Sequence, residues 1–259
     1  MVTPLNTIKN KIVNFLKKEF KKRNRNLAII GISGGIDSAV AATLAKESNL
    51  NLLAVLLPFK KKSYKYAKEV VNFLELPKSN ILEIDITPFI YSQLKALKRK
   101  GIVLDKISLG NLILRQRMMF LMALKDQMNG LVIGSQNLSE YLLGYFTLYG
   151  DSAADIFPLA GLWKTQIYKL ADFLKIPKQI IERKPTGDWP YFSDEKELGF
   201  DYEYADEILY FYLIKKMSPE NIIKRYNFDK KLVKKVIERY KITSFKRNDP
   251  SRYLFKRSK

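Results

Sequence analysis

Cysteine and histidine are both absent from this sequence of 259 residues. Without them the chain cannot build a Ser-His-Asp or Cys-His catalytic group, a thiolate zinc site or an HExxH metalloprotease site. It cannot form a disulfide either, so nothing in its composition indicates an oxidising compartment. Any catalysis must use carboxylates, hydroxyls, lysine, arginine, backbone amides or a hard metal ion held by oxygen. This inventory favours chemistry on phosphate groups.

Long apolar runs are also missing. No stretch of about 18 apolar residues occurs, so we expect no membrane-spanning helix. Residues 1–20 carry apolar side chains at helical spacing with lysines between them, unlike the continuous apolar segment of an export signal. We therefore expect a cytoplasmic protein. This apolar stripe suits either core packing or a subunit interface, and it consists of Leu5, Ile8, Ile12, Phe15, Leu16 and Phe20.

Acidic residues are few relative to basic ones, 26 against 46, which gives a formal net charge of +20. Such a charge suits a nucleic-acid-binding face, or a lysine-rich surface that serves a small polyanionic substrate. The lysines are scattered along the chain, and no RRM or zinc-finger signature accompanies them. We therefore do not expect nucleic acid as a partner. A basic helix-turn-helix in residues 218–240 is the alternative, although its turn lacks the glycine often found there.

Apolar runs rich in β-branched residues alternate with helix-periodic segments in the first half of the chain. Buried strands are predicted at residues 27–32, 52–57, 81–86 and 131–133, and helices at residues 37–47, 63–74 and 112–128. This alternation predicts an α/β fold with a doubly wound parallel sheet and helices on both faces. Ligands of such sheets bind at the carboxyl ends of the strands. We expect residues 1–259 to form a single domain.

After about residue 160 the pattern becomes helical. Helices are predicted at residues 163–174 and 202–216, and two more follow the cap residues Ser218 and Asp229. Residues 183–200 contain prolines, glycines and charges without periodicity. Loops of this length are often lids over a binding site.

The most informative motif is SGGIDS, which follows the first predicted strand and opens a helix. Glycines let the backbone approach an anion closely, and the free amides at the helix start point towards it. Asp37 would repel bare phosphate, so its presence indicates Mg²⁺ between carboxylate and phosphate. No GxxxxGKS, GxxxxGKT or GxGxxG occurs, which excludes the P-loop and Rossmann alternatives. The predicted phosphate site comprises Gly31, Ile32, Ser33, Gly34, Gly35, Ile36, Asp37 and Ser38.

This loop resembles the pyrophosphate loop of the N-type ATP pyrophosphatases, whose fold is that of the adenine-nucleotide α-hydrolases. From about residue 30 to residue 250, further blocks are similar in order and spacing to those of ammonia-dependent NAD synthetases. These blocks are residues 110–118, 134–140, 144–151, 154–155, 158–159, 162–166, 184–187 and 193–199. A related pyrophosphatase that acts on tRNA is the alternative favoured by the charge, but it would not predict the block at residues 144–151.

The resemblance implies a ligase of NAD biosynthesis. Such an enzyme amidates deamido-NAD with ammonia through an adenylated intermediate and releases NAD, AMP and pyrophosphate. ATP would be the co-substrate, Mg²⁺ the cofactor and a homodimer the assembly. Glutamine-dependent versions carry a glutaminase domain with a catalytic cysteine, so we expect free ammonia, or ammonia from a partner chain, as the donor.

The resemblance also implies metal and ATP ligands at matching positions. Asp37 and Glu140 would hold Mg²⁺. Ser135, Lys164 and Thr186 would contact ATP together with the phosphate loop, and Lys164 would neutralise the leaving pyrophosphate. The alternatives are that Glu140 merely faces water and that Lys164 is merely exposed in the first turn of its helix, where a cation is mildly unfavourable.

The remaining implied roles concern the dinucleotide and ammonia. Arg115, Asp155 and Lys246 would contact deamido-NAD, although Arg115 could equally be a solvated helix residue. Asp151 would orient or deprotonate ammonium, which makes it, with Lys164, an expected catalytic residue.

Two positions depart from the family pattern. Leu148 stands where a lysine is usual, and Phe245 stands where a histidine is usual. The first change removes a charge from the substrate region, whereas the second keeps a ring that can stack on a purine or ribose. Both concern substrate affinity more than the chemistry.

Overall fold

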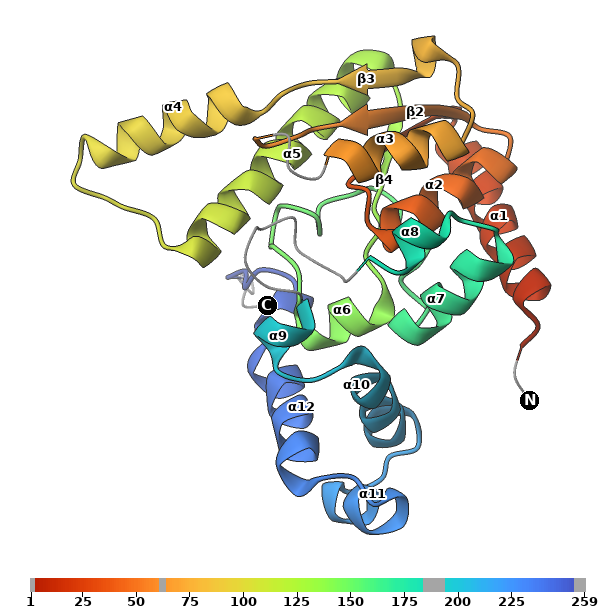
Figure 1. Ribbon diagram of the computed structural model, residues 1–259, viewed down its shortest axis with the longest axis vertical. Coiled ribbons are helices and arrows are strands. Elements are labelled where there is room, and N and C mark those ends of the chain that lie inside the picture. The colour runs from red at the N-terminus through yellow and green to blue at the C-terminus, as the bar shows by residue number, and fades with distance from the viewer. Residues whose placement is uncertain (1–2, 61–63, 184–193, 254–259) are drawn as a thin grey trace, which may run out of the picture.

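A sheet of four parallel strands lies in the upper part of the computed structural model as drawn in Figure 1, and the structure describes residues 3–60, 64–183 and 194–253. The strand order is β3-β2-β1-β4, and Ala28 of β1 is in register with Leu52 of β2 and Leu131 of β4. The strands are β1 (Leu27–Gly31), β2 (Asn51–Leu56), β3 (Ile81–Glu83) and β4 (Leu131–Ile133). The helices are α1 (Leu5–Lys22), α2 (Ile36–Glu47), α3 (Tyr64–Phe73), α4 (Thr87–Lys98), α5 (Lys106–Met128), α6 (Leu138–Leu143), α7 (Lys164–Phe173), α8 (Lys178–Ile181), α9 (Asp194–Leu198), α10 (Tyr202–Leu209), α11 (Pro219–Tyr226) and α12 (Lys230–Ile242).

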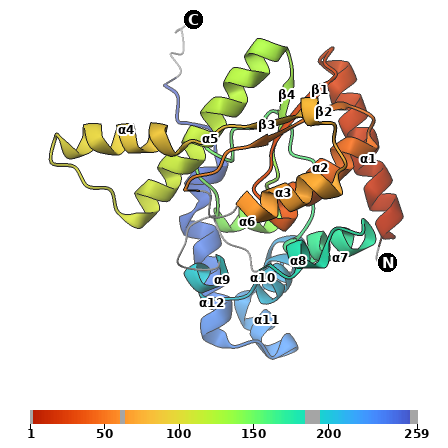
Figure 2. The ribbon, with the colours of Figure 1, turned by 45° about the horizontal axis from the view of Figure 1, so that its top comes forward.

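Helices cover both faces of this sheet. Successive strand residues point to opposite sides, so each face presents apolar side chains that need a covering layer. Ala28 and Ile30 lie in one buried cluster with residues of α1, α2, α3 and α7. Ile29 lies in a second cluster with residues of α4 and α5; α4 and the beginning of α5 project beyond the sheet (Figure 2). The predicted doubly wound α/β arrangement is thus confirmed.

The strand order creates a switch point between β1 and β4. After β1 the chain returns to the sheet on one side as β2, whereas β4 pairs with the other edge of β1. The loops that leave the carboxyl ends of β1 and β4 therefore diverge, which is where ligands bind in sheets of this kind.

The C-terminal part of the chain has a buried cluster of its own, with residues from α6, α9, α10, α11 and α12. The predicted caps are confirmed: Ser218 accepts a hydrogen bond from the Asn221 amide, and Asp229 accepts one from the Leu232 amide. These side chains satisfy amides that the first helical turn leaves unpaired. The helical C-terminal part predicted from the sequence is therefore present.

Several segments differ from the prediction. The helix predicted at residues 202–216 ends as α10 at Leu209 and continues as a π-helical turn, Tyr210–Ile214. Within the segment predicted as a loop at residues 183–200, α9 forms at Asp194–Leu198, and residues 184–193 lie outside the described part. The helix α4 has no counterpart in the prediction, and β3 ends at Glu83 instead of residue 86.

The apolar stripe of α1 packs mainly into the core. Leu16 and Phe20 are fully buried in the cluster that also contains α2 and α7 residues, whereas Phe15 is 42% exposed. Of the two alternatives for this stripe, core packing accounts for its inner side. No helix in the described ranges is both long and apolar enough to cross a bilayer.

Candidate active site

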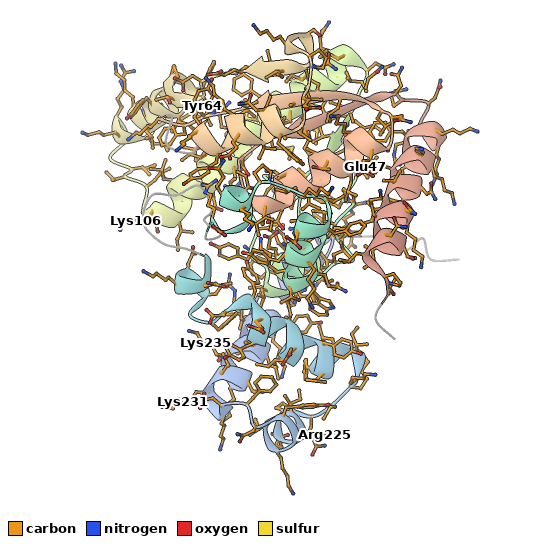
Figure 3. All side chains as sticks on the ribbon, turned by 45° about the vertical axis from the view of Figure 1, so that its right-hand side comes forward. Glu47, Tyr64, Lys106, Arg225, Lys231 and Lys235 are labelled. Carbon is orange, nitrogen blue, oxygen red and sulfur yellow. The ribbon has the colours of Figure 1, made fainter. Side chains whose placement is uncertain are left out.

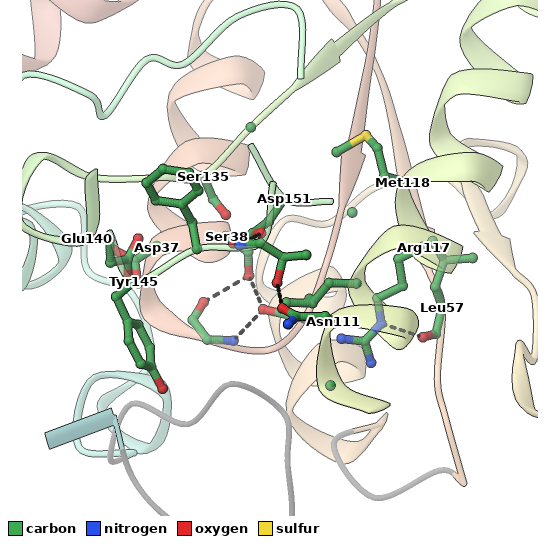
Figure 4. A pocket seen from close by; sticks show the side chains of 18 of the residues that line it. Asp37, Ser38, Leu57, Asn111, Arg117, Met118, Ser135, Glu140, Tyr145 and Asp151 are labelled. Atoms are coloured by element: carbon green, nitrogen blue, oxygen red, sulfur yellow. Dashed lines mark hydrogen bonds between the residues drawn. The ribbon is translucent and has the colours of Figure 1, made fainter. Parts of the chain in front are cut away.

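A cavity of about 1020 Å³ opens at the carboxyl ends of β1 and β4 (Figure 4). Its walls come from the loop after β1, from α5, from the loop after β4, from residues 144–151, from the start of α7 and from the C-terminal residues 239–246. Pockets for one small ligand commonly measure ~300–1,000 Å³, so this cavity lies at the upper end of that range and is large enough for a nucleotide.

The loop between β1 and α2 forms one wall of the cavity. Gly34 has φ of +78°, and a β-carbon there would lie 2.5 Å from the Ala67 amide nitrogen, so only glycine fits. Gly35 is the extended N-cap of α2. The Ser33 and Ser38 hydroxyls lie 3.1 Å apart, and Ser38 donates to the Gly35 carbonyl. Two hydroxyls thus lie together at the start of α2, an arrangement that suits a phosphate group.

Asn137 connects this loop to the loop after β4. It is fully buried, and its Nδ2 donates to Asp37 Oδ1 at 2.8 Å. Its Oδ1 accepts from the Glu140 amide at 2.9 Å, and Glu140 Oε2 accepts from the Asn137 amide at 3.3 Å, which is a capping box at the start of α6. One buried amide therefore fixes the positions of Asp37 and Glu140, which lie side by side in Figure 4.

Lys164 contacts both of these carboxylates. Its Nζ lies 2.5 Å from Asp37 Oδ2 and 3.3 Å from Glu140 Oε1. The side chain is only 1% exposed and passes 5.4 Å from the centre of the Tyr202 ring. Lys164 is the first residue of α7, where the helix dipole disfavours a cation, so the two carboxylates offset that cost. The alternative of a solvent-exposed lysine is therefore wrong.

The start of α7 is tied to α10 by a buried polar group of residues. The Ser139 hydroxyl accepts from the Lys164 amide at 2.8 Å and donates to Asp206 Oδ1 at 2.5 Å. Asp206 Oδ2 accepts from the Thr165 amide at 3.0 Å and from its hydroxyl at 2.9 Å. Burial raises the pKa of Asp206. The backbone of Lys164 is thus fixed independently of its side chain.

Asp151 lies on the opposite part of the cavity wall, in the turn of residues 147–151. Its Oδ1 accepts from the Thr147 amide at 2.7 Å. Burial raises the pKa of Asp151 to about 6, from an ordinary value of 3.8, although this amide bond acts in the opposite direction. A carboxylate in this state can accept a proton near neutral pH.

Lys246 holds the chain segment before this turn. Its Nζ donates to the carbonyls of Gly144 and Phe146 at 2.8 and 2.7 Å. Burial lowers the pKa of Lys246, and the charge of Arg239 acts in the same direction. This lysine thus shapes the Asp151 side of the cavity through backbone carbonyls.

The acidic side chains also show which metal ions suit the cavity. In the described part of the chain, no group of three or more Asp or Glu side chains comes together in a metal-binding arrangement. Asp37 and Glu140 therefore offer two carboxylates to a cation, which are too few to surround it. Mg²⁺ is commonly held in this way, by one or two carboxylates with substrate phosphates and water. The residues present fit Mg²⁺ bound together with a nucleotide.

Comparison with known proteins identifies the family. A family profile described as NAD synthase matches residues 8–250. The chain belongs to the NAD synthase family. The NH(3)-dependent NAD(+) synthetase of Fusobacterium nucleatum is 36% identical over 252 residues, 95% of each chain. That of Thermococcus kodakarensis is 40% identical over 216 residues, which is 82% of this chain and 83% of the relative.

Solved structures of this family have the same fold. The NH3-dependent NAD synthetase of Campylobacter jejuni aligns with a TM-score of 0.79 at 30% identity, over 97% of this chain and all of that one. An NMN synthetase from Francisella tularensis aligns with a TM-score of 0.85, also at 30% identity, over 98% of this chain and all of that one. The NAD synthase fold therefore spans almost the whole chain.

Most residues predicted for an NAD synthase site line one cavity. Those that do are Gly31, Ile32, Ser33, Gly35, Ile36, Asp37, Ser38, Ser135, Glu140, Asp151, Lys164 and Lys246. Gly34 forms the turn behind them. Phe245, one of the two departures from the family pattern, also lines the cavity.

Two predicted residues lie elsewhere, and a third falls outside the described residues. Arg115 is exposed, and its Nε donates to the Leu148 carbonyl at 3.1 Å. Asp155 pairs with Lys125 Nζ at 2.8 Å and accepts from the Val132 amide at 2.8 Å. Both therefore hold backbone segments near the cavity in this structure. Thr186 belongs to residues 184–193, of which nothing is described.

Two residues of the site received no role from the sequence. Asn137 stands three residues before Glu140, which is the spacing of a capping box, so this signal was present. Arg183 lines the cavity, donates to the Gly34 carbonyl at 2.9 Å and stacks over the Tyr66 ring at 4.6 Å. It comes from a stretch without periodicity, so no local pattern identifies it.

Proposed function

We propose that this chain is an ammonia-dependent NAD synthetase, which uses ATP to amidate deamido-NAD and releases NAD, AMP and pyrophosphate. The observation that carries the proposal is the meeting of a phosphate-type loop with Asp37 and Glu140 in one cavity, which Asp151 also lines. The relatives at 36% and 40% identity are NH(3)-dependent NAD(+) synthetases, which supports the same reaction.

The chain has to position two anions and neutralise charge, because the attacking oxygen belongs to the substrate. The loop of residues 31–38 would bind the ATP phosphates through its amides and hydroxyls, with Ser135 beside them. Lys164 would stabilise the negative charge that develops on the leaving pyrophosphate. Thr186 is proposed as a further ATP contact on the resemblance alone.

Asp37 and Glu140 would hold Mg²⁺. When bound, this ion neutralises phosphate charge and orients the phosphates for in-line displacement. Asn137 keeps both carboxylates in place, so the protein-derived half of the metal site is already ordered.

The other side of the cavity would receive the dinucleotide and ammonia. Lys246 would attract the substrate's anionic groups, while Arg115 and Asp155 would act through the segments that they hold. Asp151 would bind ammonium and take its proton, since its raised pKa makes it a better base than an ordinary carboxylate.

Three properties of the whole protein complete the proposal. The chain would form a single NAD synthetase domain, as the match over residues 8–250 supports. It would act as a homodimer, as the resemblance implies. It would work in the cytoplasm, where its proposed substrates ATP and deamido-NAD are available.

The direct test is an assay for NAD and AMP with ATP, Mg²⁺, deamido-NAD and either ammonium or glutamine. Formation of both products with ammonium, and neither with glutamine, is the expected result. Equal turnover with glutamine alone, or AMP formation that needs tRNA instead of deamido-NAD, would overturn the proposal. Analytical ultracentrifugation on the same sample tests the homodimer.

A second candidate substrate is the mononucleotide form of the same carboxylate. The similarity to an NMN synthetase favours it, as does Leu148, which removes a charge usual in the dinucleotide-binding enzymes. Values of kcat/KM for nicotinate mononucleotide and for deamido-NAD decide between the two. We expect the larger value for deamido-NAD.

A further inference from the structure

The ammonium group of Lys164 lies at the point where the proposed function requires a metal ion. It contacts Asp37 at 2.5 Å and Glu140 at 3.3 Å, and both carboxylates line the nucleotide cavity. The side chain is 1% exposed, so water does not screen these contacts as it would at the surface. One lysine thus supplies positive charge to both proposed metal ligands.

A second positive ion cannot enter this point while the ammonium stays. Two like charges a few ångströms apart repel strongly where water is excluded. A free divalent cation would also have to give up part of its hydration shell, which Mg²⁺ does reluctantly. Free Mg²⁺ therefore gains little by binding to the resting site.

The electrostatic interactions at the two carboxylates change when a cation arrives bound to ATP. The phosphates bring several negative charges and oxygen acceptors, to which the ammonium can move. The backbone of Lys164 is held by Ser139, and the neighbouring Thr165 is held by Asp206, so the side chain can turn while the start of α7 remains in place.

We propose that Lys164 is a placeholder cation. It keeps Asp37 and Glu140 in metal-binding positions, excludes free divalent cations and yields its position only when nucleotide phosphates arrive to accept its ammonium. The metal then enters together with ATP. This inference rests on the proposed role of Asp37 and Glu140 as the magnesium carboxylates.

The test uses Mn²⁺ as a spectroscopic probe, with the full chain and without nucleotide. Free Mn²⁺ is followed by electron paramagnetic resonance for the wild type, Lys164→Met and Lys9→Met. Lys9 forms a surface ion pair with Glu47 at 2.9 Å, so its variant has the same charge change outside the site. We expect Lys164→Met to bind one Mn²⁺ at least about tenfold more tightly than the wild type and Lys9→Met.

The double variant Asp37→Asn, Lys164→Met assigns this gain to the site, because it should lose the added affinity. Equal Mn²⁺ affinity in the wild type and a folded Lys164→Met would overturn the inference. Near-UV circular dichroism checks the fold, and Lys164→Gln replaces Lys164→Met if the latter does not fold. A second comparison measures Mn²⁺ affinity in the wild type and in Asp37→Asn, both without nucleotide. If the wild type binds Mn²⁺ more tightly than Asp37→Asn, the inference is also overturned.

The same titration with an ATP analogue separates this inference from the proposed function. Mn²⁺ that binds with the analogue in the wild type but not in Asp37→Asn supports the metal role of these carboxylates. No difference between the two proteins would count against that role itself. The substrate that is amidated does not affect either result, because no turnover is measured.

Discussion

The carboxylates of the cavity differ because their surroundings differ. Asp37 accepts a hydrogen bond from the buried side-chain amide of Asn137 and contacts the buried ammonium of Lys164. Asp151 accepts a backbone hydrogen bond, but burial dominates and raises its pKa to about 6. The two residues are chemically identical, yet one suits a metal ligand and the other a base.

Replacement of either proposed metal ligand tests the first of these roles. Asp37→Ala and Glu140→Ala should each lower NAD formation by at least about a hundredfold, because each removes an oxygen ligand where charge builds up on the pyrophosphate. Near-UV circular dichroism should show that the fold is retained. Glu220→Ala, at an exposed position in the first turn of α11, is the control. Wild-type turnover in either site variant would exclude the assigned metal site.

The pH dependence of activity tests the second role. NAD formation at constant ammonium should fall as the pH drops below about 6, because protonated Asp151 cannot accept a proton from ammonium. Asp151→Asn should be slow throughout, without this dependence on pH. An unchanged profile in Asp151→Asn would assign the titration to another group.

The raised pKa of Asp151 also makes the free energy of unfolding depend on pH. The direction of this dependence is opposite to that of an ion-paired carboxylate, whose pKa is lowered. The folded-state pKa is above the ordinary value of 3.8, so the folded chain binds this proton more tightly than the unfolded chain does. The stabilisation is complete below about pH 4 and is lost as the pH rises through about 6. Between these limits, the free energy of unfolding should fall by about 1–3 kcal/mol more in the wild type than in Asp151→Asn, as denaturant titrations can measure.

At the scale of elements, local sequence patterns predicted the strands and helices whose boundaries are set by neighbouring residues. The strands β1 and β2 and the helices α2 and α7 begin within one residue of their predicted positions, since burial periodicity and glycine punctuation act locally. The strand β3 is shorter than predicted, because it lies at the edge of the sheet and pairs only with β2. The π-helical turn Tyr210–Ile214 was missed, because a helix-periodic stretch does not reveal a local change in hydrogen bonding.

The residues that organise the site depend on contacts between distant elements, so local patterns did not reveal them. Asp206 is the clearest example: it lies on α10, yet it accepts hydrogen bonds from Thr165 and Ser139, which belong to α7 and α6. Its sequence neighbours suggest only an acidic residue on an amphipathic helix. The structure shows that it substitutes for an N-cap at the helix that carries Lys164.

Asp206→Ala should therefore reduce both stability and activity. Loss of buried hydrogen bonds to the first turn of α7 should lower the free energy of unfolding by about 2–4 kcal/mol. It should also lower kcat, because the backbone of Lys164 loses its support. Asp229→Ala removes an exposed cap of α12 and is the matched control, with an expected loss of about 1 kcal/mol and unchanged kcat. Equal kcat in Asp206→Ala and the wild type would contradict the positioning role.

At the scale of the molecule, the cavity lies where the sheet and the C-terminal helices meet. Arg239, Lys246 and Arg247 donate to carbonyls of residues 142–146, about a hundred positions earlier in the chain. Other basic residues lie on the outer surface, such as Lys231 and Arg225 in Figure 3. The basic residues of the described part thus include cations that join the two regions around the cavity and exposed cations on helix surfaces.

Lys246 provides the sharpest test of this junction. Lys246→Met keeps most of the side-chain volume but removes the hydrogen bonds to Gly144 and Phe146, so the free energy of unfolding should fall by about 2 kcal/mol. The segment before Asp151 would lose its anchor, and the KM for ammonium should rise by about tenfold, since misplacement of a binding group weakens its contact with the substrate. Lys241→Met, an exposed position on α12, controls for the loss of charge. A lower affinity for deamido-NAD with an unchanged KM for ammonium would show instead that Lys246 acts only on the dinucleotide, because loss of an anchor for the Asp151 segment must raise the KM for ammonium.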